Sequence, residues 1–74
     1  MEKFISSFTE LFDETMPETF TPTTRFRELS EWSSLTALSV MAMVAEEYDV
    51  QLTGDEMRSV HTIEELYNLV QSKQ

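Results

Sequence analysis

Apolar residues recur at helical spacing along most of this chain, and this periodicity decides its fold class. The first stretch, residues 2–14, places its apolar side chains on one helical face, namely Phe4, Ile5, Phe8, Leu11 and Phe12. Residues 34–48 and 63–72 repeat the pattern, and a shorter segment, residues 54–60, lies between them. No pair of segments alternates as strands do. The spacing therefore predicts an all-α protein, one domain over residues 1–74, built as a small four-helix bundle.

Two capping boxes mark the starts of the last two helices. Thr53 and Thr62 each provide an N-cap hydroxyl, and Glu56 and Glu65 follow three residues later. The only histidine, His61, lies between these helices, with no second histidine or cysteine nearby. We therefore expect a capping or solvated side chain there and not a metal ligand.

A long connection, residues 15–33, separates the first two helices. Pro17 and Pro22 break helical continuity within it. A connection of this length is uncommon in a compact domain and usually carries function. Its apolar residues are expected to pin it onto the core, and they are Phe20, Phe26, Leu29 and Trp32.

Composition excludes several classes of function. Fourteen acidic residues against five basic ones give a net charge of −9, which disfavours nucleic acids and anionic membranes as partners. Such acidity attracts basic protein surfaces, although it also simply keeps a small protein soluble. No apolar run can span a bilayer and the N-terminus does not resemble a secretory signal, so we expect a cytoplasmic protein without membrane insertion. The lack of cysteine removes thiol nucleophiles, and the single glycine removes glycine-rich phosphate loops.

The sequence shows no constellation of catalytic residues. His61 lies far along the chain from any serine with an activating context. Adjacent acids such as Asp13 and Glu14 point in different directions on a helix, so they do not form a general acid–base pair. We therefore expect no catalytic residue and no metal site.

A serine pair stands at the predicted start of the most apolar helix, directly after the long connection. Ser33 is a favourable N-cap residue, which puts Ser34 at the first helical position with its hydroxyl open to solvent and to modifying enzymes. A helix N-terminus presents unpaired N–H groups and the positive end of the helix dipole, so it stabilises an anionic group on such a hydroxyl. Capping serines are common, and the residues alone leave the role of the pair open.

The helix that follows is apolar over more than half of its circumference, as a central helix with neighbours on two sides requires. Its predicted inward face consists of Leu38, Met41, Ala42, Ala45 and Tyr48. Met43 falls in the polar arc between Thr36 and Glu47, which predicts an exposed side chain that contacts a partner.

At this point the sequence resembles a family. Residues 26–35, Phe-Arg-Glu-Leu-Ser-Glu-Trp-Ser-Ser-Leu, are similar to the acyl carrier protein signature, in which a Phe-x-x-x-Leu segment leads into Asp-Ser-Leu. Residues 41–50 resemble the family's second helix and its Glu-Glu-Phe-aliphatic exit, and residues 62–70 resemble its fourth helix. The family's serine carries phosphopantetheine and aligns with Ser34. The resemblance thus implies a covalent phosphopantetheine cofactor on Ser34, beside the N-cap Ser33.

Carriage, not catalysis, is what this resemblance implies. A phosphopantetheinyl transferase would move the group from coenzyme A onto the Ser34 hydroxyl, and its thiol would supply thioester chemistry that a cysteine-free chain lacks. The chain would then be a monomer that presents acyl intermediates to acyl-transferring or acyl-condensing enzymes of fatty-acid, polyketide or other specialised lipid synthesis. These enzymes would dock through basic or apolar patches onto Leu35, Thr36, Ser39, Ala42, Met43, Glu46 and Glu47. The expected acyl pocket lies between the helices and is lined by Leu38, Met41, Met57 and Ile63.

The chain departs from the family pattern at several positions. Ser33 stands where the family usually has Asp, which keeps the helix cap but removes a charge. Thr36, Ser39 and Ala45 occupy places that are often acidic in the family. These departures favour dedicated partners that recognise apolar contacts more than charge. A Met43→Glu substitution is then expected to leave folding intact and to weaken partner turnover.

Two alternatives stay open. An aminoacyl or peptidyl carrier has the same chemistry, but it usually shows Gly-Gly-x-Ser-Leu at this site, and neither glycine is present here. A carrier-fold interaction module that has lost the arm is compatible with a serine pair that lacks the aspartate.

Overall fold

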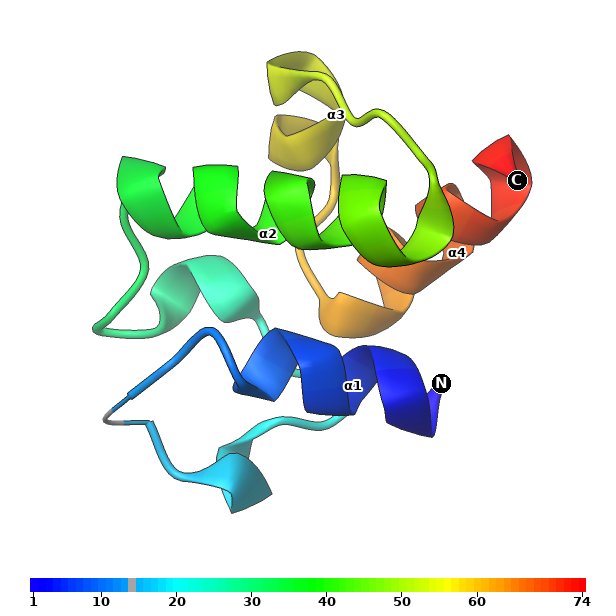
Figure 1. The fold of residues 1–74 in the computed structure, drawn as a ribbon. Helices are drawn as coiled ribbons and strands as arrows, with labels where there is room; N and C mark the ends of the chain where they lie inside the picture. The colour runs from blue at the N-terminus through cyan, green and yellow to red at the C-terminus, as the bar shows by residue number, and fades with distance from the viewer. Residues whose placement is uncertain (14) are drawn as a thin grey trace.

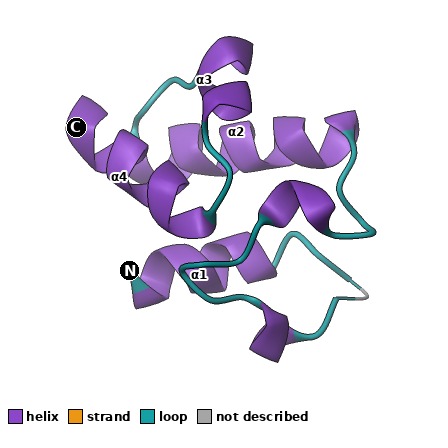
Figure 2. Cartoon of the chain, turned by 180° about the vertical axis from the view of Figure 1, so that it is seen from behind, coloured by secondary structure: helices purple, strands orange, loops and turns teal. Residues whose placement is uncertain are grey.

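The computed structural model describes residues 1–13 and 15–74, and this part of the chain contains four α-helices (Figure 1). Their bounds are α1 Glu2–Thr9, α2 Ser34–Tyr48, α3 Gly54–Ser59 and α4 Ile63–Lys73, with short 3-10 helices η1 Pro17–Thr19 and η2 Phe26–Glu28 in the long connection. The predicted all-α bundle is confirmed. Figures 1 and 2 both show η2 between α1 and α2, so the long connection passes through the middle of the assembly before α2 begins.

Helix α1 is shorter than its apolar spacing predicts. It ends at Thr9, so the expected continuation toward residue 14 is wrong for the described residues, and Glu14 itself lies outside them. Leu11 N donates to Phe8 O at 3.1 Å and Phe12 N donates to Thr9 O at 3.0 Å, which are the tighter bonds of a 3-10 turn. The Phe12 ring still stacks on Phe8 with centroids 5.5 Å apart. The apolar pattern therefore continues beyond the α-helix that it predicts.

Aromatic rings join α1 to the long connection. The Phe8 ring lies 6.0 Å from that of Phe20 and 5.7 Å from that of Phe26, centroid to centroid. Phe26 in turn packs on Trp32 at 4.9 Å. Phe20 and Phe26 are buried and Leu29 and Trp32 pack against the core, so the predicted anchors are confirmed. These contacts fix the chain to the core up to two residues before α2.

Helix α2 runs through the middle of the bundle, with α1 on one side and α3 and α4 on the other (Figure 1). It buries Val40, Met43 and Val44. The prediction of an exposed Met43 is wrong, because its side chain is only 6% exposed and belongs to the core. The predicted inward face is wrong at Leu38, which is 60% exposed, and at Ala42, which is also exposed.

The reason is that α1 covers the arc of α2 that looks polar in the sequence. The buried Ser7 of α1 donates its hydroxyl hydrogen to Oε1 of Glu47 at 2.8 Å. Glu47 follows Met43 by four residues and so lies on the same face of the helix. A polar contact at the end of the arc thus brings α1 over Met43, and the opposite arc is left to solvent.

Both predicted capping threonines are confirmed. Thr53 Oγ1 accepts a hydrogen bond from Glu56 N, and Thr62 Oγ1 accepts one from Glu65 N, each at 3.1 Å. The Glu56 carboxylate completes the first box by accepting from Thr53 N at 2.9 Å. The Glu65 carboxylate accepts from His61 N at 2.7 Å, one residue before the cap. Local chemistry therefore sets where α3 and α4 begin.

The C-terminus of α4 is tied to the start of α3 by Lys73. Its ammonium donates to Glu56 Oε1 at 2.6 Å and to the Gln51 carbonyl at 2.7 Å. The hydrogen bond from Lys73, followed by that from the Thr53 backbone, lowers the pKa of Glu56. Because the carboxylate is harder to protonate in the folded chain than in the unfolded one, its contribution to stability is complete above the ordinary carboxyl pKa and is lost in acid.

Replacing Lys73 should therefore have a pH-dependent effect. We expect Lys73→Met to lower the free energy of unfolding at pH 7, and the difference from wild type should narrow as the pH falls below the ordinary Glu value of 4.5. Urea unfolding at several pH values between 7 and 3 measures this. Lys3→Met, the same change of charge on an exposed site of α1, is the control. A Lys73→Met deficit that stays constant down to pH 3 would contradict the role given to Glu56.

The burial of Met43 makes a second prediction, which reverses the earlier expectation for this residue. Met43→Glu places a carboxylate in the core and should lower the free energy of unfolding by at least about 3 kcal/mol. Ala42→Glu, one residue earlier on the exposed arc, should change it by less than about 0.5 kcal/mol. Thermal and urea unfolding followed by circular dichroism compare the two. Equal effects of the two substitutions would mean that Met43 is not a core residue.

Candidate functional site

The serine pair lies at the junction of the long connection and α2. Ser33 is the N-cap, and its Oγ accepts a hydrogen bond from Thr36 N at 3.3 Å. Ser34 is the first residue of α2 and is exposed, as its predicted position requires. The Ser34 hydroxyl is thus presented to solvent at the positive end of a helix of 15 residues.

Glu31 fastens the segment just before the serine pair to the end of the first helical region. Its carboxylate accepts hydrogen bonds from Asp13 N at 3.1 Å and from the Thr15 hydroxyl. Its carbonyl accepts one from the Thr36 hydroxyl at 2.9 Å, inside the first turn of α2. Sequence reasoning missed this positioning role, because no local pattern links an acid to backbone groups 18 residues away.

A pocket of about 500 Å³ opens beside Ser34, between α2 and α3. Its apolar side chains are Trp32, Ala37, Leu38, Met41 and Met57. Ser33, Ser34, Gly54 and Arg58 complete the lining. The predicted pocket residues Leu38, Met41 and Met57 are therefore brought together next to the serine.

The fourth predicted pocket residue, Ile63, is placed elsewhere. It is fully buried in the core and does not line the pocket, so that assignment is wrong. Ile63 follows the capping Thr62 directly, and the first turn of α4 packs inward beneath the long connection, where Ile63 N donates to the Thr24 carbonyl at 3.2 Å. Trp32 and Arg58 are lining residues that sequence reasoning missed. Trp32 could have been found from its place two residues before the serine pair.

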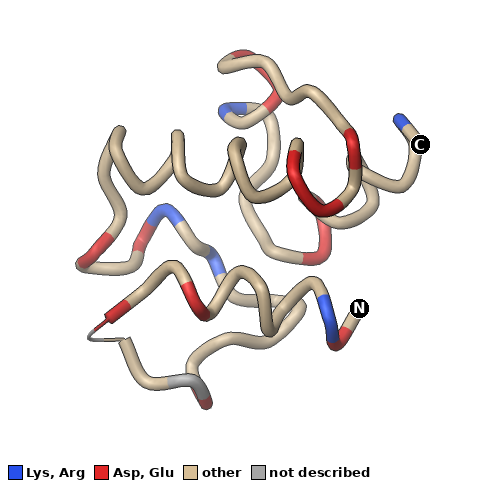
Figure 3. The backbone as a smooth tube through the Cα atoms, in the orientation of Figure 1, with Lys and Arg blue, Asp and Glu red and all other residues tan. Residues whose placement is uncertain are grey.

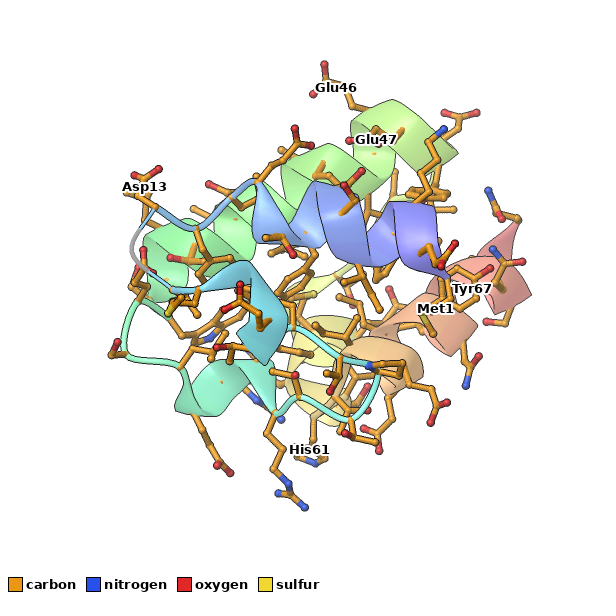
Figure 4. The ribbon with its side chains drawn as sticks, turned by 90° about the horizontal axis from the view of Figure 1, so that it is seen from below. Met1, Asp13, Glu46, Glu47, His61 and Tyr67 are labelled. Carbon is orange, nitrogen blue, oxygen red and sulfur yellow. The ribbon has the colours of Figure 1, made fainter. Side chains whose placement is uncertain are left out.

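The predicted partner face divides into two parts. Leu35, Ser39, Ala42 and Glu46 lie on the outward arc of α2, and Leu35 is 73% exposed. The other predicted members are turned toward the rest of the molecule through contacts described above, namely Thr36, Met43 and Glu47. Figure 4 shows the difference between neighbours, since Glu46 points away from the body while Glu47 lies near α1. With Leu38, the outward arc forms an apolar strip, Leu35–Leu38–Ala42, beside Ser34.

The charge distribution leaves the start of α2 neutral. Residues 34–45 contain no acidic or basic side chain. The tube of α2 in Figure 3 is accordingly tan until its C-terminal end, where Glu46 and Glu47 follow. No acid stands in the first turn of the helix. A phosphate on Ser34 would therefore meet the helix dipole without repulsion from a carboxylate in that turn.

Metal binding and histidine chemistry find little support in residues 1–13 and 15–74. No group of three or more His, Cys, Asp or Glu side chains is close enough there to hold a metal ion. His61 is exposed, and its Nδ1 contacts the Arg27 guanidinium. Across the same residues, none of the helices has both the length and the apolar character that a membrane crossing requires.

Comparison with known proteins identifies the family. A family model described as "phosphopantetheine attachment site" matches residues 4–70, which is most of the chain. A search of curated proteins gives no match. The residues at the start of α2 fit such a group, because an exposed hydroxyl, free of nearby carboxylates, stands at a helix N-terminus next to an apolar pocket. The chain therefore belongs to the phosphopantetheine attachment family, as a carrier domain of the acyl carrier type to which phosphopantetheine is covalently attached.

Proposed function

We propose that the phosphopantetheine arm is attached to Ser34 and that the chain carries an acyl intermediate as a thioester on this arm. The observation that carries the proposal is the place of Ser34, which is exposed, begins α2 and borders the pocket. Ser33 also borders the pocket, but its Oγ is engaged as the cap of α2 by Thr36. An engaged cap oxygen is the poorer nucleophile, since its lone pair already accepts a hydrogen bond.

The attachment step balances without a redox partner. The Ser34 oxygen forms a bond to the phosphorus of coenzyme A's pantetheine phosphate, the bond from that phosphorus to the adenosine-bearing phosphate breaks, and a base of the transferase takes the hydroxyl proton. The chain contributes an accessible nucleophile and a helix terminus that stabilises the resulting phosphodiester. The attached group supplies the thiol for thioester formation. We therefore treat the chain as a carrier that serves as the substrate of other enzymes.

The pocket favours an acyl cargo over an aminoacyl or peptidyl one. Leu38, Met41 and Met57 give it apolar walls directly beside the attachment point. Methionine is unbranched and polarisable, so two of these three side chains can adapt to guests of different shape. A polar aminoacyl group would gain little from such walls, whereas an aliphatic chain would be removed from water.

The apolar strip Leu35–Leu38–Ala42 is the surface that we assign to partner enzymes. It is exposed and lies beside Ser34, with Ser39 and Glu46 at its margin. Partners that read this strip would bury apolar side chains next to the arm, as hot spots at protein interfaces do. We place these partners among cytoplasmic enzymes of fatty-acid, polyketide or other specialised lipid synthesis.

The attachment site can be tested by mass. Coexpression with a broad-specificity phosphopantetheinyl transferase should add the mass of one phosphopantetheine to the wild-type chain, and Ser34→Ala should abolish the addition. Ser33→Ala should still be modified, with a helix weakened by about 1 kcal/mol from loss of the cap. Intact-protein mass spectrometry reads all three. Absence of added mass in the folded wild type under every transferase tried would favour an interaction module without the arm.

The partner strip gives a separate prediction. Leu35→Ala should leave the melting temperature unchanged and lower kcat/KM of the transferase toward this chain by about tenfold, the loss of one interface contact worth about 1.4 kcal/mol. Met16→Ala, which truncates another exposed large apolar side chain far from the strip, should leave the rate unchanged. Equal rates for the two variants would show that the strip does not contact the transferase.

A further inference from the structure

One wall of the pocket carries a charge that the apolar cargo proposed above does not need. Arg58 is the only ionisable residue among those that line it. The whole chain contains only five basic residues against fourteen acidic ones. A cation at this place therefore runs against the composition of the chain and calls for an anionic ligand.

The backbone of Arg58 is fixed from outside α3. Arg27, on η2, donates from Nη1 to the Arg58 carbonyl at 3.0 Å. The Arg58 side chain folds back along α3, since Nη1 lies 3.5 Å from the point where a Cβ on Gly54 would stand. Gly54 itself lines the pocket. This nitrogen therefore lies close to the wall of the pocket.

The guanidinium is held only weakly by its present partner. Its Nη2 pairs with Asp55 one turn earlier in α3, and the two side chains are 71% and 90% exposed. Ion pairs with that exposure contribute little to stability. A guanidinium has five N–H donors in a planar fork, so it can bind a carboxylate in the pocket through the nitrogens that Asp55 does not use.

We propose that Arg58 makes the pocket selective for an acyl group that bears a carboxylate on its far part. The proposal rests on the carrier function proposed above and names its cargo class. The apolar walls at Leu38, Met41 and Met57 enclose the aliphatic part, and the Arg58 guanidinium pairs with the carboxylate. Without this cation, a carboxylate placed on a chain of net charge −9 would be repelled and poorly solvated.

The phosphodiester of the arm is the other anion near the pocket, and the structure favours the carboxylate. The start of α2 already offers the phosphate backbone N–H groups and the positive end of a helix dipole. Arg58 belongs to the other helix of the pocket and has no counterpart in α2, where residues 34–45 are uncharged. A carboxylate on the cargo has no other cation in the pocket lining.

The test compares two cargoes of equal chain length that differ only in a terminal carboxylate, octanoyl and 7-carboxyheptanoyl. Both are loaded from their coenzyme A thioesters onto wild type, Arg58→Gln and Arg25→Gln, and intact mass verifies loading. The last variant removes an exposed arginine that pairs with Glu28 outside the pocket. The readout is the rate at which hydroxylamine cleaves the thioester, because a sheltered acyl chain draws the thioester out of solvent.

We expect Arg58→Gln to raise the cleavage rate of the carboxylated thioester by at least about threefold and to leave that of the octanoyl thioester unchanged. Arg25→Gln should change neither rate. An equal increase for both cargoes would overturn the proposal and assign to Arg58 only the cover that its aliphatic stem provides. No change for either cargo would overturn it as well.

Two further outcomes separate this proposal from its neighbours. A change confined to the phosphorus NMR shift of the unacylated, arm-bearing protein in Arg58→Gln would show that the guanidinium binds the phosphodiester instead. Failure of the folded wild type to accept either cargo, seen as no added mass, would overturn the carrier function itself and with it the cargo class. In every other case loading succeeds and the two cleavage rates decide.

Discussion

The packing of Phe26 is the contact on which the rest of the structure depends. This ring is fully buried, and it lies 5.7 Å from Phe8 of α1 and 4.9 Å from Trp32. Trp32 is at once an anchor of the long connection and a wall of the pocket, and Ser34 follows two residues later. A chain of 74 residues has one core and little surplus stability, so the same aromatic contacts that hold it together also place its site.

From this constraint the properties of the site follow. The connection enters α2 along a fixed path, with Glu31 bonded to Asp13 and Thr15 on one side and to Thr36 on the other. The first turn of α2 is thereby held open to solvent on the arc that bears Ser34 and Leu35. Its neutrality and its helix dipole suit an attached phosphate, and the pocket beside it suits what the arm would carry.

Local chemistry was readable from the sequence, and long-range packing was not. The caps at Ser33, Thr53 and Thr62 depend on residues within one turn, so the starts of three helices could be predicted. Spacing cannot tell which arc of an apolar helix its neighbours cover, and this is why Met43 proved to be buried and Leu38 exposed. The same limit applies to the pocket, where adjacent helices bring together residues that no spacing links. Leu38, Met41 and Met57 were identified by the family resemblance, while Arg58 required the structure.

The central claim is that the hydroxyl of Ser34, and not that of Ser33, holds the arm. Fragmentation of the modified protein by a method that preserves the phosphodiester, followed by sequencing of the peptide that contains both serines, tests this most directly. We predict that every fragment break between the two residues places the added mass on the C-terminal side, at Ser34. Added mass on Ser33, or at a residue outside this peptide, would contradict the account.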